Sequence, residues 1–181
     1  LLRRTIDSRA DDEVPLRDEL SFVQRYIEIM EIRFQGRLRV EQNIAEETLE
    51  ALVPNLVLQP LVENALEHGT ARAKGEARIE IATRRDDSRL VMTVRDNGPG
   101  PGASAGSGVG LANTRARLAQ LYGNAASLSL TAAPGGGALA EIIIPFHTLS
   151  EGQTPSLANE PAGEVEMAGE GAGAPESRGA A

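Results

Sequence analysis

The chain lacks cysteine and tryptophan altogether, and its aromatic residues are limited to three phenylalanines and two tyrosines. Without cysteine, disulfide bonds, thiolate nucleophiles and cysteine-ligated zinc or iron–sulfur clusters are excluded. No apolar run approaches the ~20 residues that a membrane-spanning helix needs, and no signal peptide is visible. We therefore expect a cytoplasmic chain without direct membrane contact, whose full-length protein could still be membrane-anchored. The start at Leu1 rather than methionine favours a fragment.

Positive charge is also scarce, because 18 basic residues stand against 26 acidic ones and Lys74 is the only lysine. A Walker-type P-loop requires the string G-x-x-x-x-G-K-[ST], which does not occur. The formal net charge is −8, of which −5 falls on residues 151–181, leaving −3 for residues 1–150. No basic surface of the density that binds duplex nucleic acid is visible, so we expect no nucleic-acid partner.

A length of 181 residues suits one domain with a sizeable core. Residues 149–181 are dominated by Ala, Gly, Glu and Pro. Such a segment cannot bury enough apolar surface to offset the entropy of ordering it, so a disordered acidic tail is predicted. Residues 1–13 have the pattern of a helix end followed by a polar linker. The predicted folded domain is therefore 14–148.

Hydrophobic spacing predicts both helices and strands within this domain. A helix is expected over residues 16–35, where apolar residues recur at intervals of three and four and Gly36 can end the helix. Alternation predicts strands at 38–44, 77–83, 90–94, 127–131 and 138–144, and helices are expected at 60–69 and 109–122, ended by Gly69 and Gly123. Residues 98–108 contain five glycines and two prolines, which suits a mobile lid.

Three polar or glycine-rich strings lie at the ends of these elements. On the helix at 60–69, Asn64 and His68 are four residues apart and so share a face. Asp96 ends a strand ahead of a glycine turn, and a second glycine run at 106–110 opens the last helix, whose first N–H groups can face phosphate. Each string alone is ordinary, since Asp-Asn-Gly is usually a turn and a glycine run is often a linker. Together they predict a nucleotide site with a metal-bridged triphosphate.

The same strings resemble those of a known superfamily. Leu-Val-Glu-Asn-Ala at 61–65, Asp-Asn-Gly-Pro-Gly at 96–100 and Gly-Val-Gly-Leu-Ala-Asn-Thr at 108–114 are similar to the N, G1 and G2 boxes of the GHKL (Bergerat-fold) ATP-binding proteins. Tyr-Ile-Glu-Ile at 26–29 and the following Arg-Phe resemble sensor histidine kinases of the LytS/YehU type. The resemblance, which covers about residues 1–147, implies an α+β fold. In this two-layer α/β sandwich, helices cover one face of a mixed, mostly antiparallel sheet.

The resemblance also implies ATP and Mg²⁺ as cofactors. Asn64 matches the amide that coordinates magnesium, a hard ion that prefers oxygen ligands and retains waters. Asp96 matches the carboxylate that accepts a hydrogen bond from the adenine amino group, and Gly98 and Gly100 would let the backbone pass close to the purine. The remaining nucleotide contacts implied are His68, Gly106, Gly108, Val109, Gly110, Leu111 and Asn113.

A catalytic base is not evident among the matched positions. Water-activating relatives carry a glutamate four residues before the metal asparagine, where this chain has Pro60. Glu63 is the one candidate, although it points about 100° away from Asn64 around the helix. A site without a base suits a kinase, because phosphoryl transfer depends mainly on positioning and charge neutralisation. Glu67 stands where related kinases often carry a basic residue near the phosphates, and whether its negative charge weakens ATP binding stays open.

The acceptor histidine of such kinases lies upstream, on a dimerisation hairpin whose end residues 1–13 resemble. His68 and His147 are the only histidines, neither is in that place, and His147 is expected to be simply exposed. The resemblance therefore implies a kinase domain that donates the ATP γ-phosphate to a histidine outside this chain. A homodimeric full-length protein and relay to a response regulator follow from the same resemblance.

Two alternatives stand beside this interpretation. A GHKL serine kinase of the anti-sigma type would share the fold, but the amphipathic helix at 16–35 and the Tyr-Ile-Glu-Ile string argue against it. A non-catalytic module that binds ATP and transfers nothing stays open.

Overall fold

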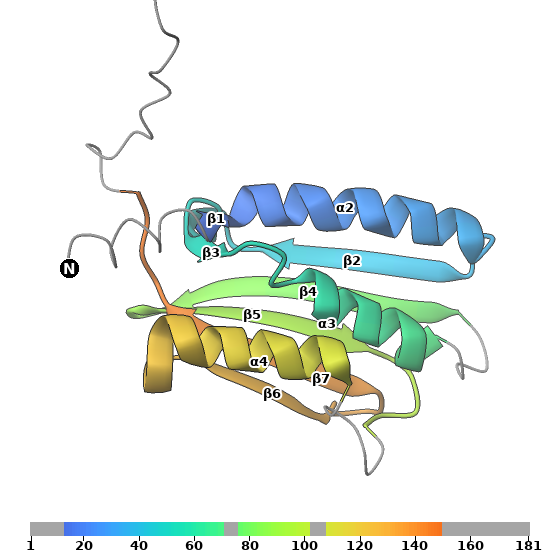
Figure 1. Cartoon of the computed structure of the whole chain (residues 1–181). Coiled ribbons are helices and arrows are strands. Elements are labelled where there is room, and N and C mark those ends of the chain that lie inside the picture. The colour runs from blue at the N-terminus through green and yellow to red at the C-terminus, as the bar shows by residue number, and fades with distance from the viewer. Residues whose placement is uncertain (1–12, 71–75, 102–107, 150–181) are drawn as a thin grey trace, which may run out of the picture.

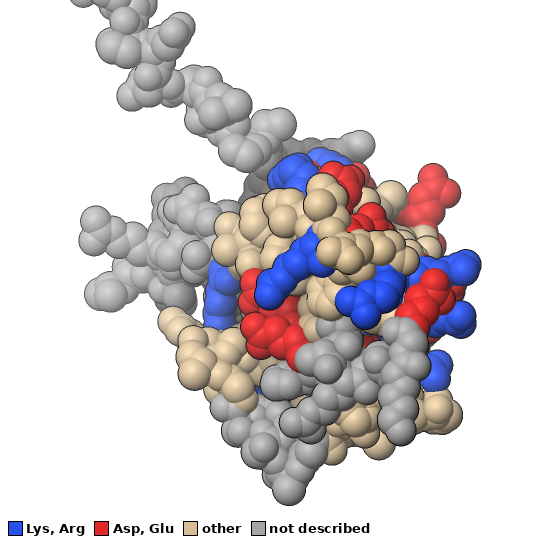
Figure 2. All heavy atoms as spheres, turned by 90° about the vertical axis from the view of Figure 1, so that its right-hand side faces the viewer, with Lys and Arg blue, Asp and Glu red and all other residues tan. Residues whose placement is uncertain are grey.

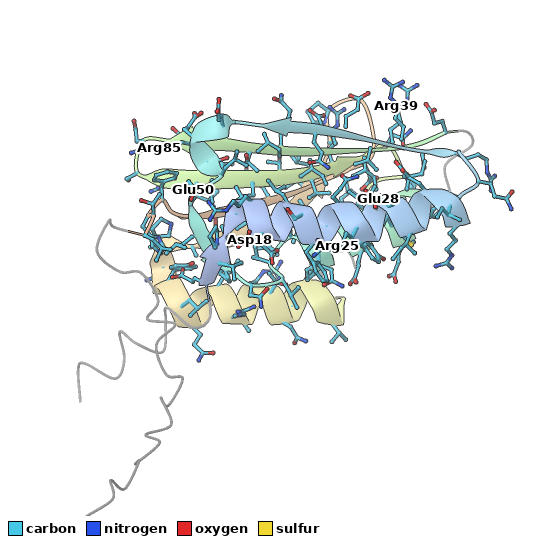
Figure 3. All side chains as sticks on the ribbon, turned by 90° about the horizontal axis from the view of Figure 1, so that it is seen from above. Asp18, Arg25, Glu28, Arg39, Glu50 and Arg85 are labelled. Atoms are coloured by element: carbon cyan, nitrogen blue, oxygen red, sulfur yellow. The ribbon has the colours of Figure 1, made fainter. Side chains whose placement is uncertain are left out.

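The computed structural model describes residues 13–70, 76–101 and 108–149, which form two layers. The predicted linker at 1–13, except its last residue, and the predicted tail after Leu149 lie outside the described residues. Figures 1 and 3 show a twisted sheet on one side and the helices on the other. This is the predicted α+β sandwich with helices on one face, and it is confirmed.

The sheet has five strands in the order β2-β4-β5-β7-β6. The strands are β2 (Leu38–Ile44), β4 (Ala77–Asp86), β5 (Arg89–Asp96), β6 (Ser127–Ala132) and β7 (Ala138–Pro145). Only the β2–β4 pair is parallel, and the other three pairs are antiparallel. The mixed, mostly antiparallel sheet is thus as expected, and each predicted strand is present with ends shifted by a few residues.

Side-chain alternation decides which residues of the sheet face the helices. In β4 every second residue from Ala77 to Thr83 is buried, while the intervening Arg78 and Glu80 are exposed. In the antiparallel pairing of β4 with β5, Asp96 lies opposite the buried residue Ile79. The side chain of Asp96, the last residue of β5, therefore points toward the helical layer. A carboxylate therefore stands at the end of an apolar strand face, under the helices.

Two long helices cover the sheet. Helix α2 (Leu16–Arg33) buries the predicted stripe, with Leu16, Val23 and Ile27 almost fully enclosed. Helix α4 (Val109–Tyr122) has the predicted bounds and ends at Gly123, whose φ of +59° lies in the left-handed region that glycine tolerates. Figure 1 shows a shorter helix, α3 (Gln59–Asn64), between them.

The α3 region differs from the sequence prediction. The α-helix ends at Asn64 and continues as a π-helical segment, Ala65–Thr70, so Gly69 does not close the helix. The switch in helix type begins directly after Asn64, and nothing in the apolar spacing signals it. Within the described residues, no helix is both long enough and apolar enough to cross a bilayer.

A second, two-stranded sheet escaped the sequence analysis. Strand β1 (Glu13–Pro15) pairs antiparallel with β3 (Leu52–Pro54), next to a 3-10 turn at Glu46–Thr48. Strands of three residues are too short to show alternation in the sequence. The pair fixes the beginning of α2 against the segment that leads into α3.

Candidate nucleotide site

Asp96 is a buried carboxylate at the end of β5, with 5% of its surface exposed. Its Oδ1 accepts hydrogen bonds from the N–H of Gly98 at 2.8 Å and of Ala138 at 3.3 Å. Within the described residues, its Oδ2 makes no hydrogen bond. One oxygen thus fixes the side chain while the other can accept a hydrogen bond from a ligand, which is the property that the adenine assignment requires.

The turn between β6 and β7 is shaped to the backbone of Asp96. A Cβ on Gly137 would stand 1.8 Å from the carbonyl oxygen of Asp96, and the φ of Gly137 is +88°. Gly100 is also in the left-handed region, at +83°, and a Cβ on it would approach the carbonyl oxygen of Gly137 to 3.1 Å. Glycines 135–137 lie between the two predicted strands at 127–131 and 138–144. Their spatial role beside Asp96 comes from a contact between residues 41 positions apart.

Asn97 has a structural role next to this carboxylate. Its Oδ1 accepts from the N–H of Arg78 at 2.8 Å, and its Nδ2 donates to the carbonyl of Glu76 at 3.0 Å. The side chain thereby holds the beginning of β4 against the loop that leaves β5. This arrangement fixes the place where the loop turns toward Gly98.

Asn64 ends α3 and is half-buried, and the structure records no hydrogen bond for its side chain within the described residues. Its amide oxygen can therefore bind a hard cation without breaking an existing contact. No group of three or more His, Asp or Glu side chains that could hold a metal occurs among the described residues. The donor set suits an ion held by one amide, by phosphate oxygens and by water.

Glu63 is held away from Asn64 by its own contacts. Its Oε1 accepts a hydrogen bond from Nε2 of Gln59, one helical turn earlier, at 2.7 Å. On α2, burial raises the pKa of Tyr26, and the negative charges of Glu63 and then Glu67 raise it further. Both carboxylates therefore lie near Tyr26, Glu63 in α3 and Glu67 in the π-helical segment, and Glu67 is exposed to solvent.

The first turn of α4 offers main-chain donors rather than side chains. Gly108 precedes the helix, Val109 is 77% exposed, and Leu111 is buried in the core. Gly110 lies against Pro60 of α3, since a Cβ on it would stand 3.6 Å from the proline Cβ. The N–H groups of the first turn have no partner inside a helix and can donate to an anion. Any contact of Leu111 with a nucleotide would therefore come from its backbone.

Beyond the start of α4, two polar side chains bond to the protein's own main chain. Thr114 Oγ1 donates to the carbonyl of Gly110 at 3.0 Å, and Arg115 Nε donates to the carbonyl of Leu128 at 3.4 Å. Asn113 is exposed and forms no recorded hydrogen bond within the described residues. Of these three polar side chains, Asn113 is the one left available for a nucleotide.

Two predicted nucleotide contacts cannot be placed. Gly106 lies outside the described residues, in the gap at 102–107 that includes most of the predicted lid. His68 is in the π-helical segment, but its side chain also lies outside the described part. The structure therefore brings together Asn64, Asp96 and the start of α4 at one end of the molecule. Figure 2 looks onto this end, where acidic and basic residues are interspersed.

A hollow of about 490 Å³ lies on the other side of the sheet. It is lined by Glu41, Glu76, Arg78, Ile79, Glu80, Arg95, Asp96 and Asn97. Most of these side chains belong to the exposed face of β2, β4 and β5, opposite the helices. The hollow is open, it contains both charge signs, and it does not include Asn64 or α4. We therefore do not assign the nucleotide to it.

His147 is not simply exposed, which corrects the expectation from the sequence. Its Nε2 lies 3.2 Å from Oε2 of Glu13, its Nδ1 lies 3.3 Å from the carbonyl of Pro145, and its ring meets Tyr122 edge-on. The hydroxyl of Tyr122 donates to the other carboxylate oxygen of Glu13. The hydrogen bond to Glu13 raises the pKa of His147, while partial burial opposes the rise. These residues join β1, α4 and the chain after β7.

Two family models match this sequence. The model of the "Histidine kinase-, DNA gyrase B-, and HSP90-like ATPase" matches residues 51–148. The model of "Histidine kinase" matches residues 1–38. The first includes every candidate nucleotide residue, and the second includes β1 and α2.

Curated relatives are sensor kinases. The chain is 38% identical over 89 residues to sensor histidine kinase BtsS of Escherichia coli, covering 49% of this chain and 16% of the relative. It is 30% identical over 153 residues to sensor protein LytS of Bacillus subtilis, covering 77% of this chain and 26% of the relative. The chain thus spans about a sixth to a quarter of the length of these relatives.

Solved structures share the fold. The catalytic domain of histidine kinase ThkA superposes with a TM-score of 0.58 at 19% identity, over 74% of this chain and 94% of that one. Mycobacterial sensor histidine kinase MprB gives 0.54 at 18% identity, over 76% of this chain and 99% of that one. At such identities the likeness establishes the fold alone.

Proposed function

Because this chain belongs to the family of histidine kinase-, DNA gyrase B- and HSP90-like ATPases, we propose that it binds Mg·ATP and donates the γ-phosphate to a histidine outside this chain. It contains the ATP-binding domain of a LytS/YehU-type sensor histidine kinase. The observation that carries the proposal is the carboxylate of Asp96. It is buried under the helices, one oxygen is fixed by two backbone N–H groups, and the other makes no hydrogen bond within the described residues.

Adenine selection follows from that second oxygen. Oδ2 of Asp96 accepts a hydrogen bond from the exocyclic amino group of adenine, whereas guanine presents a carbonyl there and would leave the buried acceptor unpaired. An unpaired buried polar group costs on the order of 1–3 kcal/mol, enough to discriminate between the two bases by about 10- to 100-fold. The turn at Gly137 keeps the Asp96 backbone in the place that this contact requires.

The triphosphate is held between α3 and α4. The side-chain oxygen of Asn64 coordinates Mg²⁺, which supplies charge neutralisation to the phosphate oxygens. The N–H groups at Gly108, Val109 and Gly110 donate to the terminal phosphates, with Gly106, His68 and Asn113 as further proposed contacts. The close approach of Gly110 to Pro60 supports a single ligand spanning the two helices.

The reaction proposed is an in-line transfer. A ring nitrogen of the acceptor histidine attacks the γ-phosphorus, its N–P bond forms, and the bond between that phosphorus and the β–γ bridging oxygen breaks, leaving ADP. Phosphoryl transfer of this kind depends on positioning and charge neutralisation. Glu63 is hydrogen-bonded to Gln59 and its charge acts on Tyr26, so its carboxylate is directed away from Asn64. This supports a site without a strong water-activating base.

The partners proposed are the dimerisation hairpin of the same kinase and a response regulator, with a homodimeric full-length protein. The match of residues 1–38 to a histidine kinase model supports a hairpin directly before β1, and the sensor kinases among the relatives support a relay. We accordingly propose residues 1–13 as the hairpin end and linker, 14–148 as the kinase domain and 149–181 as a disordered tail.

Calorimetric titration with ATP, with and without Mg²⁺, tests binding, and GTP provides the comparison for base selection. Incubation with γ-labelled ATP and a separate hairpin fragment then tests transfer through an acid-labile label on the fragment. The proposal predicts magnesium-enhanced ATP binding and label on histidine. Binding without label would support a module that senses ATP, and a flat ATP titration would refute the nucleotide site.

A further inference from the structure

Glu19 is a buried acidic residue that the proposed chemistry does not use. It lies on α2 with 1% of its surface exposed, and both of its carboxylate oxygens accept hydrogen bonds from a loop at residues 55–58. Oε1 accepts from the N–H of Leu56, and Oε2 accepts from the N–H of Leu58 at 3.1 Å. The N–H of Val57 also stabilises the charge. One carboxylate therefore organises three successive peptide groups.

That loop leads from β3 directly into α3, the helix that ends with Asn64. Its conformation is not the ordinary one, because Leu56 has a φ of +59°, a left-handed value that costs a non-glycine residue roughly 1–2 kcal/mol. Leu58 precedes the helix without a side-chain cap of its own. A six-residue helix cannot fix its position by itself. Glu19 therefore fixes from α2 the loop that places the beginning of α3.

The same loop is held from the opposite side by α4. Nη1 of Arg117 donates a hydrogen bond to the carbonyl of Asn55, and its positive charge stabilises the Glu19 carboxylate. About two turns of helix closer to the nucleotide end, α4 and α3 touch where Gly110 meets Pro60. The loop is thus clamped between a carboxylate on α2 and a guanidinium on α4.

Burying the ionised carboxylate of Glu19 is unfavourable for the free energy of folding. Burial raises the pKa of Glu19 above its usual 4.5, although the loop N–H groups and Arg117 act in the opposite direction. Since the folded-state pKa is raised, the stability linked to this group is present below pH 4.5 and is lost as pH rises, so at neutral pH the ionised form weakens the fold.

We propose that Glu19 and Arg117 are positioning residues that set the distance between Asn64 and the first turn of α4, so that one magnesium-bridged triphosphate fits between them. This inference rests on the proposed function, because it assumes that Asn64 binds the metal and that α4 binds phosphate. The two residues touch the loop and not the ligand. They act through the placement of α3.

The experiment compares Glu19→Gln and Arg117→Met with Arg17→Met and Glu50→Gln in the full 181-residue chain. Arg17, at the beginning of the same helix, forms an exposed ion pair with Glu50, which Figure 3 labels. Within the described residues, neither side chain bonds to loop 55–58. Circular dichroism checks that each variant is folded at the temperature of the titration. Arg117 is half-buried, so Arg117→Met should perturb the fold less than a change at Glu19. It still tests the proposal if Glu19→Gln unfolds below the temperature of the titration.

Affinity for ATP is measured with and without Mg²⁺. Because the adenine contact at Asp96 is untouched, magnesium-free affinity should stay within about twofold, while the enhancement by Mg²⁺ should fall about tenfold in both clamp variants and stay unchanged in both controls. Transfer to a hairpin fragment should fall on the order of 100-fold, as small displacements of reacting groups do. Adding Leu56→Gly to Glu19→Gln should restore part of the magnesium effect, because glycine adopts the left-handed conformation readily.

Two results would overturn the positioning role. Clamp variants with a full magnesium enhancement would show that the loop does not set the metal site. Equal losses with and without Mg²⁺ would show a general structural role instead. If the unaltered chain binds no ATP, the proposed function itself fails, and that outcome is separate because it appears before any variant is compared.

Discussion

The two ends of the helical layer treat their polar side chains in opposite ways. At the far end, Glu13, Tyr122 and His147 bond to one another. At the nucleotide end, Asn64, Asn113 and one oxygen of Asp96 make no recorded hydrogen bond within the described residues. Both ends use the same elements, since α4 begins at one and finishes at the other. The polar groups without a recorded partner at the nucleotide end are therefore available to a ligand, and Oδ2 of Asp96 is the one that lies under the helices.

The largest expected effect comes from removing the support beneath the nucleotide end. Gly137→Ala would place a Cβ 1.8 Å from the Asp96 carbonyl oxygen in a left-handed conformation, so it should destabilise the domain by about 2–4 kcal/mol and abolish ATP binding. Gly136→Ala is the matched control. It shares the positive φ but meets nothing within 4 Å, so only the backbone strain should remain. Equal denaturation midpoints for the two variants would contradict the packing argument.

Asp96→Asn tests the role of Oδ2, the oxygen without a protein partner among the described residues, and it should perturb the fold less than Gly137→Ala. An asparagine oxygen can still accept from Gly98 and Ala138, while its amino group replaces Oδ2 and faces the adenine amino group donor to donor. Alanine would remove both functions at once. ATP affinity should fall by roughly 10- to 100-fold with little change in melting temperature. Calorimetry and thermal denaturation measure the two quantities, with exposed Asp86→Asn as the control. An unchanged affinity would remove the adenine assignment.

The elements of this comparison differ in how far they could be predicted. Helix α2, helix α4 and the five sheet strands follow from spacing, because each pattern is local and long enough to repeat. The short β1–β3 pair and the π-helical segment after Asn64 leave no such pattern. The resemblance placed Asn64 and Asp96 in the site, and the structure brings them to the same end of the fold.

The supporting residues were missed because their contacts are remote in sequence. Gly137 meets Asp96 only once β5 and β7 pair, and Glu13 meets His147 across 134 positions. Glu19 had a signal that could have been used. It stands three residues after Leu16 and four before Val23, so it falls on the buried stripe of α2, where a charge requires a partner.

Asn64→Ala is expected to act on magnesium alone. The side chain makes no recorded protein hydrogen bond within the described residues, so its removal should leave stability nearly unchanged. It should reduce the enhancement of ATP affinity by Mg²⁺ about tenfold or more. Titrations with ATP at zero and saturating Mg²⁺ give the ratio. Gln59→Ala, which removes an amide from the same helix, provides the control. A magnesium effect that persists in full would assign the metal to another residue.

The smallest effect is expected at the far end, where the polar groups already have partners. The pKa of His147 is raised above its usual 6.5, first by the hydrogen bond to Glu13, so the folded protein favours the protonated ring. That stabilisation is complete below pH 6.5 and disappears as pH rises through the higher folded-state pKa. His147→Gln should therefore lower the melting temperature more at pH 6 than at pH 9. The side chain is 40% exposed and screened by solvent, which limits the difference to at most about 4 °C.

ATP affinity should not change, because this cluster lies at the opposite end of α4 from the phosphate-binding turn. A loss of affinity would mean that the two ends are coupled through the helix, and equal melting shifts at both pH values would mean that the ring is not charged in its contact with Glu13.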